Sequence, residues 1–118
     1  MLLKLLKKLF WWRTISAQTC TELVCFVREA ASSTSKEQII QYDKIYHHTL
    51  LKLGYSGTFG EILKRNPKEI KNIQDIWDLH KLRNSLVHEL KARDEKMLQK
   101  EALRYKSICE SFIKQVTN

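Results

Sequence analysis

The chain contains few of the residues that interrupt helices and few cysteines. Its 118 residues include one proline, three glycines and three cysteines. So few turn-forming residues argue against an all-β fold, which needs a turn after almost every strand. Three cysteines without a CxxC spacing argue against both a disulfide framework and a zinc site. No apolar run approaches the roughly 20 residues that a membrane-spanning helix needs.

What the chain has in quantity is hydrophobic and helix-forming residues. The hydrophobic fraction of 43% is too high for a disordered chain. Leucine, lysine, glutamate, isoleucine and glutamine dominate the longer segments, and these residues favour helices. The sequence therefore predicts one all-α domain, a bundle of four to five helices. Two of the three cysteines lie in an apolar helical pattern, which predicts buried, reduced thiols, typical of a cytoplasmic protein.

The charge is strongly positive. There are 21 Lys and Arg residues against 13 Asp and Glu residues, a formal charge of +8. This surplus favours polyanionic partners, either nucleic acid or anionic lipid. A basic surface that is simply solvated is an equally good explanation, so the charge alone does not choose a partner.

Residues 1–13 form an apolar, basic segment without any acidic residue, distinct from residues 14–118. The leucines that share one face of a helix here are Leu2, Leu5, Leu6 and Leu9. In one interpretation the segment lies in a membrane interface, with Trp11 and Trp12 among the lipid headgroups and the lysines on anionic lipid. The protein would then be peripheral to the inner face of a membrane. In the other, it is a first helix that packs on the bundle or on a second subunit.

Capping residues divide the remainder into helices. The N-terminal caps are Thr34 with Glu37 or Ser35 with Gln38, then Thr58 with Glu61, and finally Asp94. Gly54 is placed to end the helix that begins near residue 35. Asn66 and Pro67 end the short helix after Thr58 and can cap another, because proline fits the first helical position.

The strongest chemical signal is the group Arg83, Asn84 and His88. Histidine is suited to proton transfer near neutral pH, and a guanidinium holds a phosphate by paired hydrogen bonds. On an ideal helix Asn84 and His88 project about 40° apart, whereas Arg83 and His88 differ by about 140°. The two therefore serve one site only if the helix ends or bends nearby, or if a second subunit completes the site.

Other polar and aromatic residues are better explained by structure than by chemistry. Asp43 and His47, four residues apart, are expected to be a surface pair rather than metal ligands. His80 is expected to be half-buried and hydrogen-bonded, with contact to RNA as its alternative role. Tyr42, Tyr46 and Trp77 follow helical spacing and are expected in the core rather than as platforms for bases.

Residues 77–89, WDLHKLRNSLVHE, resemble the signature of HEPN domains (higher eukaryotes and prokaryotes nucleotide-binding). The family motif is an arginine, usually followed by a polar residue, and a histidine four to six residues later. Arg83, Asn84 and His88 match it, with apolar Leu86 and Val87 before the histidine. A tyrosine found two residues after the histidine in some toxin members is absent, because that position is Leu90.

The resemblance implies an all-α bundle, commonly a homodimer that joins two motifs in one cleft. Many members are metal-independent ribonucleases, including toxins and defence proteins, and others bind RNA or act as scaffolds. It implies Arg83 and His88 as catalytic residues with Asn84 as helper, and His80, Lys81 and Arg83 as RNA contacts. No cofactor or metal is expected. The competing class is a non-catalytic helical interaction module, at a membrane surface through residues 1–13.

Overall fold

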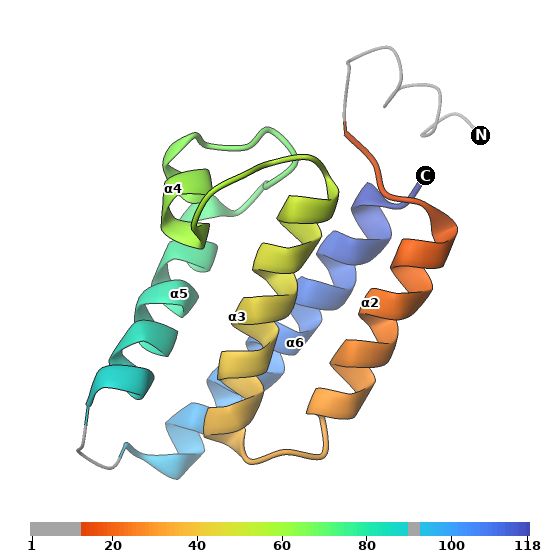
Figure 1. Cartoon of the computed structure of the whole chain (residues 1–118). Coiled ribbons are helices and arrows are strands. Elements are labelled where there is room, and N and C mark those ends of the chain that lie inside the picture. Colours follow the sequence, from red (N-terminus) through yellow and green to blue (C-terminus); the bar gives the residue numbers. More distant parts are fainter. Residues whose placement is uncertain (1–12, 90–92) are drawn as a thin grey trace.

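The computed structural model describes residues 13–89 and 93–118, and its elements in this part of the chain are helices. They are α2 (Ala17–Ala30), α3 (Ser35–Lys52), α4 (Phe59–Lys64), α5 (Ile73–His88) and α6 (Glu95–Val116) (Figure 1). The prediction of an all-α bundle is therefore confirmed. Residues 1–12, including the leucines and both tryptophans of the N-terminal segment, lie outside the described residues. Within the described part, no helix is long and apolar enough to cross a membrane.

Most helices begin at a side chain that accepts a hydrogen bond from a free N–H of the first turn. Thr58 accepts from the Glu61 N–H while the Glu61 carboxylate accepts from the Thr58 N–H, which completes the predicted capping box. The other residues with such a capping side chain are Ser16 before α2, Thr34 before α3 and Asp94 before α6. The caps predicted at Thr34, Thr58 and Asp94 are thus confirmed.

The ends of α3 and α4 show one prediction confirmed and one wrong. Gly54 follows the C-cap of α3 with φ of 104°, a conformation that glycine adopts without strain. No helix begins at Pro67. Asn66 has φ of 49°, and the segment after it makes one turn, in which the Ile70 N–H donates to the Pro67 carbonyl (3.1 Å). Residues 65–72 are therefore a connector between α4 and α5.

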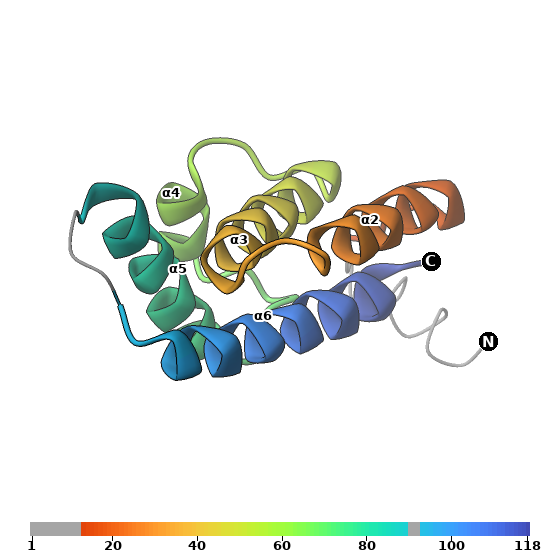
Figure 2. The same ribbon diagram turned by 90° about the horizontal axis from the view of Figure 1, so that it is seen from below.

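Helix α3 lies at the centre of the bundle, packed against α2, α5 and α6. Figures 1 and 2 show α3 and α6 running in one direction and α2 and α5 in the other. The C-terminal ends of α3 and α6, the N-terminal end of α2, and α4 all lie at one end of the bundle. Chain segments near the two termini meet at the same end, where the Ile15 N–H donates to the Val116 carbonyl (2.8 Å).

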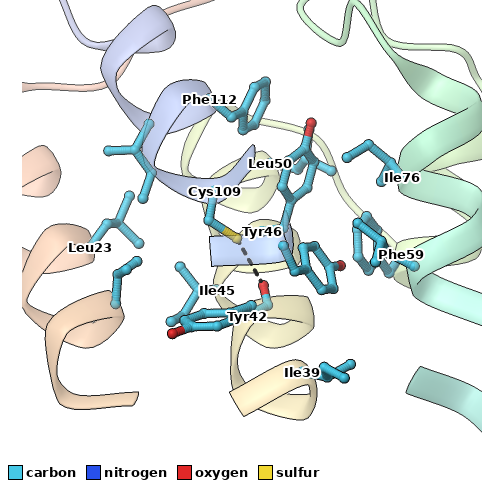
Figure 3. Packing of buried hydrophobic residues seen from close by; sticks show 14 of the residues in the cluster. Leu23, Ile39, Tyr42, Ile45, Tyr46, Leu50, Phe59, Ile76, Cys109 and Phe112 are labelled. Carbon is cyan, nitrogen blue, oxygen red and sulfur yellow. Dashed lines mark hydrogen bonds between the residues drawn. The ribbon is translucent and has the colours of Figure 1, made fainter. Parts of the chain in front are cut away.

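Aliphatic and aromatic side chains pack together in the core between these helices (Figure 3). Tyr42, Tyr46 and Tyr105 are almost fully buried. The Tyr46 ring stacks on Phe112 with the ring centroids 4.4 Å apart, and on Phe59 at 5.7 Å. Tyr42 and Tyr46 are thus core residues, as predicted, whereas Trp77 is only half-buried.

The cysteines follow the prediction only in part. All three are free thiols. Cys109 is buried and its thiol donates to the Tyr42 carbonyl at 3.4 Å; burial raises the pKa of this thiol well above its usual range. Cys20 is half-buried and Cys25 is exposed. Burial is therefore complete at Cys109 and partial at Cys20, while Cys25 lies on the solvent-facing side of α2.

The buried tyrosines make the fold sensitive to alkaline conditions. Burial raises the pKa of every tyrosine above the usual 10.0, to about 12 for Tyr55. Below about pH 10 the phenols are protonated in both states, so their contribution to stability is complete. Above it the unfolded chain loses protons that the folded protein keeps, and the free energy of unfolding falls as pH rises. Urea denaturation at increasing pH, followed by helix signal and phenolate absorbance, should show that tyrosines ionise near pH 10 only in unfolded chains, whereas Tyr55 of the folded protein ionises near pH 12. Full ionisation near pH 10 in an intact fold would contradict this.

Candidate functional site

The carboxylate of Asp43, on α3, is the centre of a buried polar group. The residue is 4% exposed. Its Oδ1 accepts a hydrogen bond from the Tyr105 hydroxyl of α6 at 2.7 Å. The Nδ1 of His80, on α5, lies 3.1 Å from Oδ1 and 3.2 Å from Oδ2. Because a carboxylate only accepts, the His80 proton sits on Nδ1. Burial, and then the charge of Asp43, raise the pKa of Tyr105 well above its usual value.

Arg83 lies one turn after His80 on α5 and reaches the same carboxylate. Its Nε is 3.5 Å from Asp43 Oδ2, an ion pair without a hydrogen bond. Its Nη1 donates to the side-chain oxygen of Asn84 at 3.0 Å. A third of the Arg83 side chain remains exposed. The guanidinium is therefore held by Asp43 and Asn84, and a third of the whole Arg83 side chain is open to solvent.

Two histidines were singled out near this group. The prediction for His80 is confirmed, and the prediction for His47 is wrong. His80 is half-buried and hydrogen-bonded, as expected, and its ring packs on Phe59 at a centroid distance of 4.6 Å. The expected surface pair of Asp43 and His47 is wrong. Asp43 is buried, and His47 instead places Nε2 3.0 Å from the Gly57 carbonyl.

His88 is the last residue of α5 and is exposed. Helix α5 continues unbroken from Arg83 to His88, so the angle of about 140° between the two side-chain directions holds. Arg83 faces Asp43 of α3, and no described residue forms a hydrogen bond with His88. A single chain therefore does not bring Arg83 and His88 onto one face. Lys81, also predicted to contact RNA, is exposed.

Arg93, just before α6, pairs with residues at the C-terminal end of α5. The Arg93 guanidinium donates to both carboxylate oxygens of Glu89, at 2.9 and 2.7 Å, and to the Ser85 hydroxyl at 2.8 Å. A bidentate pair of this kind is among the stronger charge-assisted contacts. This pair links the end of α5 to the residue just before α6. It also neutralises the charge of Glu89, the residue next to His88.

Two other kinds of site can be compared with this one. The described residues contain no group of three or more His, Cys, Asp or Glu side chains able to hold a metal. A hollow between α2 and α3 is lined by both apolar and polar side chains, among them Leu23, Phe26, Glu37 and Lys44, but it includes none of the predicted site residues. The Asp43 group and the exposed end of α5 therefore form the candidate site.

Comparison with known proteins found no match to this chain. No protein-family model matches the chain, and neither the curated proteins nor the solved structures contain a significant match.

Asp43→Asn tests whether the buried carboxylate organises the site. The change keeps the size of the side chain but leaves Arg83 and His80 without their anion. Because Arg83 is partly exposed, we expect a loss of about 2 kcal/mol in the free energy of unfolding rather than the full cost of a buried pair. Urea denaturation measures it.

The matched control is Asp78→Asn. Asp78 is an exposed carboxylate on α5 whose hydrogen bond from Gln74 Nε2 is 2.9 Å long. We expect it to change the free energy of unfolding by less than about 0.5 kcal/mol. Equal effects of the two substitutions would mean that Asp43 has no special role.

Proposed function

We propose that this chain is a HEPN-like RNA-binding protein and a metal-independent endoribonuclease. The proposal rests on the motif in residues 77–89 and on one structural observation. The Arg83 guanidinium is oriented by Asp43 and Asn84 while a third of its side chain stays exposed. An arginine held in this way can bind a phosphate with little loss of side-chain entropy.

The reaction needs one anion-binding group and one group that transfers protons. Arg83 binds the phosphodiester and stabilises the charge that develops on its oxygens, with Asn84 as positioning residue. The ribose 2′ oxygen attacks phosphorus and the bond to the 5′ oxygen breaks. His88 takes the proton from the 2′-hydroxyl or gives one to the leaving oxygen, and the other proton is exchanged with solvent. The products are a 2′,3′-cyclic phosphate and a free 5′-hydroxyl, and no metal or cofactor takes part.

The site is proposed to form between two copies of the chain. Arg83 and His88 lie on different sides of one straight helix, so one copy cannot place both on one phosphate. In a two-fold symmetric dimer, each contact made by one subunit is repeated by the other. Arg83 of one subunit and His88 of its partner then complete each site, as the HEPN resemblance implies.

The second proposal is a non-catalytic helical interaction module. It is favoured by the contacts of Asp43, which give both Arg83 and His80 a structural partner inside the chain. In this case Arg83 serves to neutralise a buried carboxylate, and His88 is an ordinary surface histidine. The two proposals differ in what His88 does, because its substitution removes no described contact.

RNA cleavage by the purified protein in the presence of EDTA tests the enzyme proposal. We expect the unaltered chain to cleave and both Arg83→Ala and His88→Ala to lose at least about a hundredfold in rate. The product ends, analysed by mass spectrometry, should carry a 2′,3′-cyclic phosphate.

Arg28→Ala and His48→Ala are the matched controls, because both residues are exposed and lie on other helices. They should cleave at the unaltered rate. Retention of helix signal and of the unfolding midpoint separates loss of chemistry from loss of fold. If His88→Ala cleaves RNA as fast as the unaltered chain, the interaction module replaces the enzyme.

A further inference from the structure

The positive charge of the protein is concentrated at one end of the bundle. This end, here called the basic pole, consists of residues 13–16, 52–72 and 114–118 (Figure 1). Contacts between these segments hold it together: Arg13 lies over the Tyr55 ring at 4.2 Å, and Gln115 donates to the Glu69 carbonyl at 2.8 Å. Its exposed Lys and Arg residues are Arg13, Lys52, Lys64, Arg65, Lys68, Lys71 and Lys114.

The acidic residues of the basic pole do little to offset these charges. The pole has two glutamates against seven Lys and Arg residues. Glu69 is 1% exposed, and its carboxylate accepts hydrogen bonds from the Tyr55 hydroxyl and the Arg13 backbone N–H. Glu61 is exposed in the capping box of α4 and offsets only one of the seven positive charges. The outer surface of the pole is therefore cationic.

The opposite end of the bundle has a different balance. Its described segments, residues 28–38, 85–89 and 93–96, contain four Lys and Arg residues and five Asp and Glu residues. Arg93 is moreover paired with Glu89. This end includes His88. The protein is thus electrically polarised along its length, with the candidate site toward the less basic end.

The basic pole is also where residues 1–12 join the described chain, because Arg13 lies within it. The sequence of that segment, MLLKLLKKLFWW, has three lysines, no acidic residue and two adjacent tryptophans. Apolar residues with lysines and tryptophans are the composition that binds the interface of an anionic membrane. The basic pole therefore contains the residue that directly follows a basic and apolar segment in the sequence, and both are rich in cations.

We propose that the basic pole binds the surface of an anionic lipid membrane. The apolar residues and tryptophans in the adjoining sequence favour a lipid interface over RNA, whose phosphates need only the cations. The membrane contact places the C-terminal end of α5, with His88, on the side of the protein that faces away from the lipid. The proposal does not depend on ribonuclease activity, which is measured without lipid.

Co-sedimentation of the full chain with vesicles tests this. The vesicles are phosphatidylcholine with or without phosphatidylserine. We expect binding only to the anionic vesicles, weakened by added salt. Each lysine near such a surface contributes about a fivefold factor in binding. The triple variant Lys52→Gln, Lys71→Gln and Lys114→Gln should therefore bind at least about tenfold more weakly.

The matched control is Lys36→Gln, Lys96→Gln and Lys100→Gln, which removes the same charge from exposed positions away from the basic pole. It should bind anionic vesicles within about twofold of the unaltered chain. Equal weakening by both triple variants would overturn the proposal, since net charge alone would then explain binding. Normal lipid binding by the triple variant of the basic pole would also overturn the proposal. So would an unaltered chain that does not bind vesicles but binds single-stranded RNA through the basic pole.

Discussion

The structure depends on how it accommodates the buried negative charge of Asp43. A carboxylate removed from water must be hydrogen-bonded or paired, otherwise its desolvation outweighs what the fold gains around it. Asp43 solves this with partners from two other helices: His80 and Arg83 of α5, and Tyr105 of α6. Because each partner must meet the same carboxylate, the contacts fix the rotation of α5 and α6 against α3. The orientation of Arg83 is one consequence of that register.

The proposed chemistry uses the edge of this arrangement rather than its centre. Arg83 has its inner side on Asp43 and Asn84, and the remainder of its side chain reaches solvent. His88, five residues on, is carried around the helix to a different side. The same rigid α5 that orients the arginine thus separates it from the histidine. Arg83 and His88 can therefore share a site only if a second subunit contributes one of them. The C-terminal end of α5, which carries His88, lies at the opposite end of the bundle from the basic pole.

The helices were predictable because their signals are local. Thr34, Thr58 and Asp94 cap helices through hydrogen bonds to residues two or three positions later, and Gly54 supplies a conformation that few other residues adopt. Local patterns also placed Arg83 and His88 on one helix. The interpretation of Asn66 and Pro67 as the start of a helix failed, since a proline permits a helical start without requiring one.

The centre of the site was not predictable in the same way. Asp43 and Tyr105 are 62 residues apart, and Asp43 and His80 are 37 apart. Nothing within one turn of Asp43 distinguishes it from an exposed aspartate beside a histidine. Glu69 is similar: it is buried by contacts with Arg13 and Tyr55, distant in the sequence. Such burial is a property of packing between helices, which the order of residues in one helix does not contain.

The central claim is that Arg83 of one subunit and His88 of its partner act on one phosphodiester. Mixing purified Arg83→Ala and His88→Ala chains, each inactive alone, measures this directly. After subunit exchange half of the dimers are mixed and each has one intact composite site, so about a quarter of the unaltered cleavage rate should return. No recovery, although native mass spectrometry shows that mixed dimers have formed, would contradict the claim.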